Sequence, residues 1–174
     1  MPHVNKVLGV VFFSAVLALT ANAQQQQPAR GGQGGGAGAQ AGRGNQPPRA
    51  PLTRSMFLSH DKINGCNAAG TFVNTPEYMI QCSHRTGPGV VEIHKKETDI
   101  IYVVDGTATF VTGGTPTGMS AEDTDQPRGK TSTGGEEHHL VKGDIIAVPA
   151  GQPHWFKDVP ASGVSYYVVK VLKP

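Results

Sequence analysis

Residues 143–158, GDIIAVPAGQPHWFKD, constrain the fold of this 174-residue chain more than any other segment. Residues 144–148 are apolar and β-branched after the first position, which is typical of a buried strand. Residues 149–151 then supply a turn, because proline fixes φ and glycine permits a positive φ. His154 begins the next strand. We therefore expect a strand, a tight turn and a second strand that aims an imidazole into a barrel.

A second group of polar residues lies upstream in EIHKKETDIIYVVDG, residues 92–106. Glu92 and His94 are two residues apart, so on a strand both side chains point to the same face. Asp99 opens the strand-like run DIIYVV that follows. These polar side chains therefore sit where neighbouring strands begin or end.

The downstream segment resembles the second conserved motif of the cupin superfamily, G-x5-P-x-G-x2-H-x3-N. It matches at every position except the last, where Asp158 stands for asparagine. The upstream segment is similar to the first cupin motif, H-x-H-x(3,4)-E-x6-G. His94 takes the second histidine position, Glu92 stands at the first, and Asp99 replaces the glutamate before Gly106. The resemblance covers about residues 70–172.

This resemblance implies an all-β fold, the double-stranded β-helix or jelly-roll barrel of cupins. The chain agrees, because many short strand candidates alternate with turn signals. The candidates are residues 72–73, 78–82, 90–94, 100–104, 107–112, 139–141, 145–148, 154–157 and 164–172. One short N-terminal helix is expected from Ser59, as N-cap, to about Ala69. The polar, Gly-rich residues 112–135 predict a long, partly mobile loop.

In cupins the four matching motif positions converge at one end of the barrel and hold a metal. The resemblance therefore implies a site of Glu92, His94, Asp99 and His154, with Glu92 or Asp99 as the catalytic group that moves a proton. Hard oxygen ligands favour Mn or Fe, with Zn and Ni as alternatives. Two carboxylates would neutralise a divalent ion and weaken its Lewis acidity relative to a site of three histidines.

Other polar residues are expected to have structural roles. We interpret residues 95–97 as a solvated turn. His138 and His139 are consecutive, so they point to opposite faces of a strand and are expected at an exposed strand end. Trp155 and Phe156 flank His154, and core packing is expected for them, with one of the two lining the pocket as the alternative.

The first 51 residues have a different character from the rest. Residues 1–23 combine a weakly basic start, a 13-residue apolar stretch and the cleavage-site pattern Ala-Asn-Ala, which predicts a signal peptide. Residues 24–51 are rich in Gln, Gly, Ala and Pro and predict a disordered linker. We therefore expect a single domain over residues 52–174, exported to the periplasm or the extracellular space, without stable membrane insertion after cleavage.

The folded part is close to neutral and contains two cysteines. From Leu52 onward there are 11 basic and 13 acidic residues, and no basic stripe of the kind that binds nucleic acid. Export would permit a disulfide between Cys66 and Cys82, contributing roughly 3 kcal/mol to stability. Two buried free thiols are the alternative.

These features predict an exported cupin-domain protein with one divalent metal at the barrel mouth. A metal-dependent enzyme acting on a small molecule, of the oxygenase or sugar-type isomerase class, is the leading hypothesis. A non-catalytic module that binds a small molecule or a metal is the alternative, because one fold hosts many functions. A small-molecule ligand is the expected partner, with a homodimer as a candidate assembly and no nucleic acid.

Overall fold

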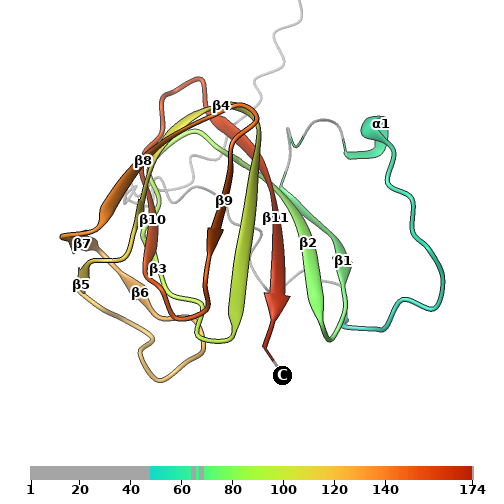
Figure 1. Ribbon diagram of the computed structural model, residues 1–174, viewed down its shortest axis with the longest axis horizontal. Coiled ribbons are helices and arrows are strands. Elements are labelled where there is room, and N and C mark those ends of the chain that lie inside the picture. The colour runs from blue at the N-terminus through green and yellow to red at the C-terminus, as the bar shows by residue number, and fades with distance from the viewer. Residues whose placement is uncertain (1–47, 64–65, 67–68, 174) are drawn as a thin grey trace, which may run out of the picture. The chain divides into compact units, whose positions relative to one another are not determined.

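The computed structural model describes residues 48–63, 66 and 69–173 of the chain. The predicted signal peptide and the linker up to residue 47 lie outside these residues. The described part contains one helix and eleven strands (Figure 1). They are α1 (His60–Ile63), β1 (Gly70–Asn74), β2 (Tyr78–Arg85), β3 (Val91–Glu92), β4 (Glu97–Thr112), β5 (Thr115–Thr117), β6 (Arg128–Gly129), β7 (Thr131–Thr133), β8 (Glu136–Val141), β9 (Ile145–Val148), β10 (His154–Asp158) and β11 (Val164–Leu172).

Strand β4 joins the two sides of the barrel. Its first half pairs with β9 and β11, and its second half pairs with β8 and β10. Gly106 lies between the halves with φ of 79°, and a Cβ there would lie 2.1 Å from the carbonyl oxygen of Gly163. The sequence predicted a turn at this glycine between two strands. The structure instead has one strand that bends, because only glycine fits this close backbone approach.

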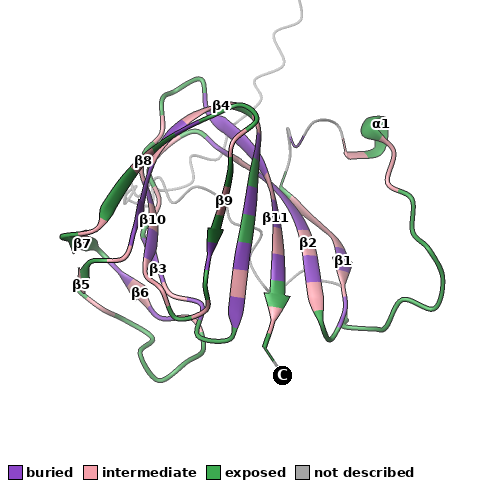
Figure 2. Cartoon of the chain, in the orientation of Figure 1, coloured by how far each residue is buried: buried purple, intermediate pink, exposed green. Residues whose placement is uncertain are grey.

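The remaining strands extend from the two halves of β4. One side runs β1-β2-β11-β4, with β9 also on β4, and the other runs β4-β10-β3-β6, with β8 also on β4. Buried residues lie along the strands of both sides (Figure 2). The result is the predicted all-β, double-stranded β-helix. The space between its sides is where the expected site must lie.

The apolar core occupies one part of this interior. It contains Ile101, Val103, Ala108, Phe110, Leu140, Val148, Phe156, Val164, Tyr166 and Val168. Aromatic rings pack in its centre. The ring of Phe156 lies 4.7 Å from that of Phe110 in an edge-on contact and 4.9 Å from that of Tyr166 in a stacked contact. Such contacts hold neighbouring strands in a defined arrangement.

The predicted N-terminal helix is present but shorter than expected. Ser59 caps it, because the backbone N–H of Lys62 donates to Ser59 Oγ at 3.3 Å. Among the described residues the helix covers His60–Ile63, whereas Cys66 has a φ of 63°, and strand β1 begins at Gly70. None of the helices in the described ranges is long and apolar enough to span a bilayer.

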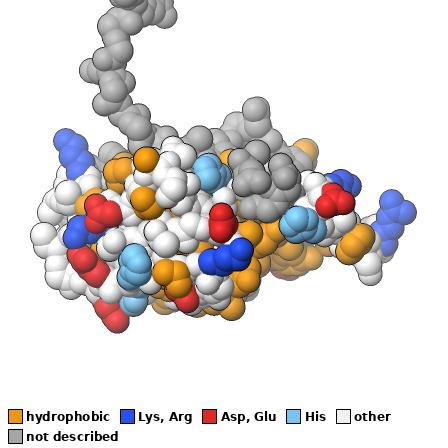
Figure 3. Space-filling view, turned by 90° about the horizontal axis from the view of Figure 1, so that it is seen from above, with side chains coloured by type: hydrophobic (Ala, Val, Ile, Leu, Met, Phe, Trp, Pro, Cys, Tyr) orange, Lys and Arg blue, Asp and Glu red, His pale blue; other side chains and the backbone are white. Residues whose placement is uncertain are grey.

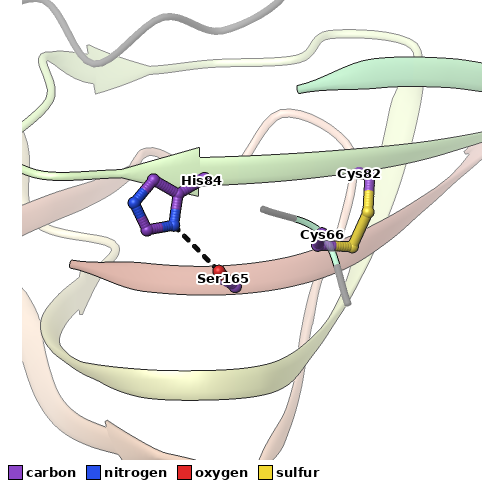
Figure 4. The surroundings of a disulfide bond; sticks show 4 residues. All are labelled: Cys66, Cys82, His84 and Ser165. Carbon is purple, nitrogen blue, oxygen red and sulfur yellow. Dashed lines mark hydrogen bonds between the residues drawn. A yellow bond between two sulfur atoms is a disulfide. The ribbon is translucent and has the colours of Figure 1, made fainter. Parts of the chain in front are cut away.

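Cys66 and Cys82 form a disulfide, which decides between the two alternatives left by the sequence (Figure 4). Their Cα atoms are 5.1 Å apart, and both side chains are buried. The bond ties the segment before β1 to strand β2. His84 lies further along β2, where its Nδ1 is 2.8 Å from Ser165 Oγ.

Residues 112–135 correct a second prediction. They are not simply a long loop, because β5 pairs with β7 and β6 pairs with β3. The β6 pairing attaches this segment to the barrel beside Glu92, which lies opposite Arg128 in the register. On the face shown in Figure 3, acidic and basic side chains of the described residues are interspersed.

Candidate metal centre

Three strands bring the four predicted site residues together. Glu92 ends β3 and lies directly opposite His154, the first residue of β10. His94 follows β3 by two residues, and Asp99 lies near the start of β4. All four side chains are buried. The motif residues therefore converge at one end of the barrel interior.

The Nε2 atoms of His94 and His154 both face one oxygen of Glu92 and one oxygen of Asp99. His94 Nε2 lies 3.3 Å from Glu92 Oε2 and 3.4 Å from Asp99 Oδ2. His154 Nε2 lies 4.0 Å from the same Glu92 oxygen and 3.7 Å from the same Asp99 oxygen. The ring centroids of the two histidines are 4.9 Å apart.

The hydrogen bonds of His154 determine which nitrogen carries its proton. Its Nδ1 lies 3.2 Å from the backbone carbonyl oxygen of Gln152. A carbonyl can only accept, so Nδ1 carries the hydrogen and Nε2 presents a lone pair to the centre.

His94 is oriented in the same way by a side chain. Its Nδ1 hydrogen-bonds Oε1 of Gln126, whose Nε2 donates to Glu97 Oε2 at 3.2 Å. The carboxylate of Glu97 requires a donor, so it fixes the amide with its oxygen towards His94. Nδ1 of His94 therefore donates, and in the neutral imidazole Nε2 would present its lone pair to the centre. Such outer partners are typical of metal-binding histidines.

This donor set fits a divalent ion. His94 Nε2 is buried and makes no hydrogen bond of normal geometry to a described residue, although Glu92 Oε2 is near. Ligands about 2.1 Å from a tetrahedral metal ion lie about 3.4 Å from one another. The separations of 3.3–4.0 Å between these nitrogens and oxygens are close to that value. Glu92, His94 and His154 together offer two imidazoles and one carboxylate.

The protonation states also suit metal binding. Burial by itself raises the pKa of the Glu92 carboxyl, but the contact with His94 and interactions with His154 and Arg128 hold that pKa well below its usual range. Burial lowers the pKa of the His154 imidazole, and the carboxylates of Asp99 and Glu92 offset only part of this effect. An ionised carboxylate and a neutral imidazole are the forms that bind metal ions.

Two buried cations lie beside the two carboxylates. Lys170 Nζ donates to both oxygens of Asp99, at 2.8 and 2.7 Å. Arg85 Nη2 lies 3.6 Å from Glu92 Oε1, and Arg85 Nε donates to the hydroxyl of Tyr166 at 2.9 Å. The sequence predicted two carboxylates that would neutralise a divalent ion. In the structure Lys170 and Arg85 already compensate much of the negative charge of Asp99 and Glu92, so less of it remains for a metal.

A small cavity adjoins this centre. Its volume of about 20 Å³ is room for about one water molecule. Its walls combine aliphatic and aromatic side chains with the polar groups of Glu92, Asp99 and His154. They are formed by Val90, Glu92, Asp99, Ile101, His154, Trp155, Phe156, Tyr166 and Val168. Trp155 and Phe156 both line this pocket, and Phe156 also belongs to the core, so this pair is not confined to core packing.

Sequence reasoning missed four residues around the centre. Glu97 was expected in a solvated turn, but it is buried while Lys95 and Lys96 are exposed. Lys170 carried a usable signal, because it continues the alternating inward positions 164, 166 and 168 of β11. Arg85 continues the inward alternation of β2 in the same way.

Gln126 is the fourth missed residue, and no sequence signal marks it. The two consecutive histidines behave as expected, because His138 is half-buried and bonded to Thr112 Oγ1 at 3.0 Å, whereas His139 is exposed.

Comparison with known proteins agrees with this architecture. The crystal structure of BH2720 from Bacillus halodurans is 11% identical, with a TM-score of 0.51 over 70% of this chain and 85% of that one. A Klebsiella pneumoniae protein with a double-stranded β-helix domain is 18% identical, with a TM-score of 0.48 over 68% and 91%. Lactobacillus farciminis oxalate decarboxylase in its formate complex is 13% identical, with a TM-score of 0.40 over 56% and 25%.

A search of curated protein sequences found no match. The cupin family model matches residues 78–174. This span includes both motifs, every strand from β2 to β11 and the four residues that converge at the barrel end. The match extends over more than half of the sequence, so this chain belongs to the cupin family.

Proposed function

We propose that this protein binds one divalent transition metal through Glu92, His94 and His154 and uses it for chemistry on a small molecule. The observation that carries the proposal is the pair of buried imidazoles whose Nε2 atoms both face one carboxylate oxygen of Glu92. Mn or Fe suit two imidazoles with a carboxylate, and Zn and Ni are the alternatives. A bound ion would supply Lewis acidity beside the cavity.

The protein side chains have separate tasks in this proposal. Glu92 is an ionised ligand, and its low pKa makes it a weak proton acceptor. The aromatic and aliphatic walls exclude water and strengthen electrostatic interactions at the centre. A sugar needs a wide cavity with many polar partners, whereas this cavity has room for about one water molecule. Among the expected enzyme classes, this observation favours an oxygenase over a sugar-type isomerase.

A non-catalytic binding module is the second candidate, and a specific observation favours it. Asp99 was expected to be able to move a proton, but both of its oxygens accept from Lys170. Glu92 is paired with Arg85 as well. A binding module needs no proton-transfer group, so this arrangement would serve it without further change.

Metal content and oxygen uptake test the proposal. Protein purified without chelator is analysed for metals before and after titration with Mn, Fe, Ni or Zn, with circular dichroism as the fold control. We expect one equivalent in wild type, and little in His94→Ala and His154→Ala. His139→Ala removes an exposed imidazole and should retain the metal. Glu92→His should also bind, with a preference shifted towards nitrogen-loving ions.

Wild type that binds none of these ions contradicts the metal proposal. If it binds one, two further results decide between the enzyme and the binding module. Metal-loaded protein that consumes oxygen with a small-molecule substrate supports the enzyme. Loaded protein that binds the molecule without turnover supports the binding module.

Export is part of the proposal, and the disulfide supports it, because disulfides persist in oxidising compartments. Protein from its native host should begin at Gln24, as measured by intact mass. Thiol alkylation of the denatured, unreduced chain should label neither cysteine. Full-length chain in the cytoplasm would contradict export.

A further inference from the structure

Lys170 occupies an unusual place for a lysine. Its neighbours on the inner face of β11, Val168 and Tyr166, belong to the apolar core. Lys170 is 5% exposed, although lysine is almost never fully buried unless paired. Its backbone lies opposite Asp99 in the β11–β4 register. The strand pairing itself therefore places the ammonium beside this carboxylate.

The ammonium contacts Asp99 more closely than either histidine does. Nζ lies 2.8 and 2.7 Å from the two Asp99 oxygens, whereas the histidine Nε2 atoms lie 3.4 and 3.7 Å from Oδ2. Nζ is also 3.6 Å from Glu97 Oε2. A buried ammonium that lost these partners would keep an uncompensated charge, so the pair resists separation.

The other carboxylate is held differently. Arg85 Nη2 approaches Oε1 of Glu92 at the longer distance of 3.6 Å, and Oε2 is the atom that faces both histidines. Glu92 can therefore offer Oε2 to a metal while it keeps this ion pair. Asp99 would have to share an oxygen with the ammonium of Lys170.

We propose that Lys170 withholds Asp99 from the metal, so that only Glu92, His94 and His154 bind it from the protein. This inference rests on the proposed function and explains why three protein residues, rather than four, would bind the metal. Three protein ligands leave coordination positions for small molecules, whereas a fourth would occupy one of them. Lys170 also cancels the charge of Asp99, which preserves Lewis acidity at the ion. Lys170 is thus a positioning residue that sets both ligand number and charge.

The test compares Mn²⁺ affinities by calorimetry in four proteins: wild type, Lys170→Met, Lys170→Met with Asp99→Asn, and Lys157→Met. Lys170→Met releases Asp99, so we expect at least about tenfold tighter binding, within the range of outer-partner effects. Adding Asp99→Asn removes the released ligand and restores neutrality, so affinity should return to within about threefold of wild type. Lys157 pairs with Glu137 at the surface, and its replacement should leave affinity unchanged.

A second readout follows the ligands directly. The visible absorption of bound Co²⁺ should change in Lys170→Met and return to the wild-type spectrum in the double variant, because coordination number sets the band intensities. If Lys170→Met fails to fold, Lys170→Gln keeps a polar group without the charge and replaces it. Unchanged affinity and spectrum in the single variant would overturn the proposal. So would a double variant that binds as poorly as His154→Ala, because Asp99 would then be a native ligand.

Failure of the proposed function gives a different pattern. If wild type binds no ion but Lys170→Met binds one through Asp99, the function is wrong and withholding by Lys170 is supported. If none of the four proteins binds an ion, both proposals are wrong.

Discussion

The two ends of the barrel interior use the same strands in opposite ways. On three strands, inward residues two positions apart change from apolar to ionisable. The pairs are Ile101 and Asp99 in β4, Val168 and Lys170 in β11, and Phe156 and His154 in β10. One end is a hydrocarbon core, and the other is a cluster of charges and imidazoles. The change from apolar to ionisable side chains therefore occurs between successive inward positions of each strand.

The difference shows how two kinds of burial depend on their neighbours. Burying apolar surface stabilises the fold by roughly 25 cal/mol per Å², and this gain does not depend on direction. A core residue can therefore obtain it from any apolar neighbours. A buried charge is costly unless a specific partner compensates it. We infer that the apolar end provides the stability, and that the ionisable end is held by the pairs Lys170–Asp99 and Arg85–Glu92.

The largest effect is expected from a substitution in the apolar end. Phe110 is fully buried and contacts Phe156, so Phe110→Ala should reduce the free energy of unfolding by about 3–5 kcal/mol. Chemical denaturation measures this loss. Phe57→Ala is the matched control, because Phe57 is 85% exposed and should change stability by less than about 0.5 kcal/mol. Equal losses in both variants would show that this core does not carry the stability.

The next largest effect is expected from a substitution at the ionisable end that replaces none of the proposed metal ligands. Arg85→Met removes the guanidinium beside Glu92 and its hydrogen bond to the Tyr166 hydroxyl. We expect the metal-free protein to lose about 2–3 kcal/mol of unfolding free energy, since removing one partner of a buried ion pair reduces the compensation of the other charge. Adding a divalent ion should recover part of the loss, because ligand binding stabilises the folded state. Thermal unfolding with and without the ion measures both, and an unchanged midpoint would contradict the pairing.

A smaller effect sharpens the comparison, because it concerns orientation rather than charge. Gln126→Leu removes the acceptor that orients His94, so metal affinity should fall about 10–100-fold. Gln152→Leu is the control, because Gln152 holds His154 through its backbone carbonyl, which the substitution retains. Metal titration of both variants checks the result. A comparable loss in the control would mean that the effect does not come from the tautomer of His94.

The smallest effect lies at the boundary between the two ends. The Tyr166 ring stacks on Phe156, and its hydroxyl accepts from Arg85. Tyr166→Phe keeps the ring and removes this acceptor, so we expect a loss of about 1 kcal/mol in denaturation experiments. A loss close to that of Phe110→Ala would place Tyr166 energetically in the core.

The two motifs were sufficient to predict which residues meet at the ionisable end. Turn residues at fixed spacing place His154 at a strand entry, and alternation places Glu92 and His94 on one face. Glu97 was predicted wrongly, because a glutamate next to two lysines looks solvated until its burial is known. Gln126 could not be predicted either, since its contact with His94 spans 32 residues and depends on how the 112–135 segment folds back.

The sequence by itself predicted the strands, the turns and an all-β architecture, because strand periodicity and turn chemistry are local properties of the chain. Its resemblance to the two cupin motifs added the jelly-roll barrel and the convergence of Glu92, His94, Asp99 and His154. Only the tertiary structure decided the charge state of that site. Lys170 and Arg85 come from strands with no motif, and they reach Asp99 and Glu92 through pairing between strands that are far apart in the sequence. Electrostatic compensation of a buried group depends on distance in space, and sequence spacing does not report that distance.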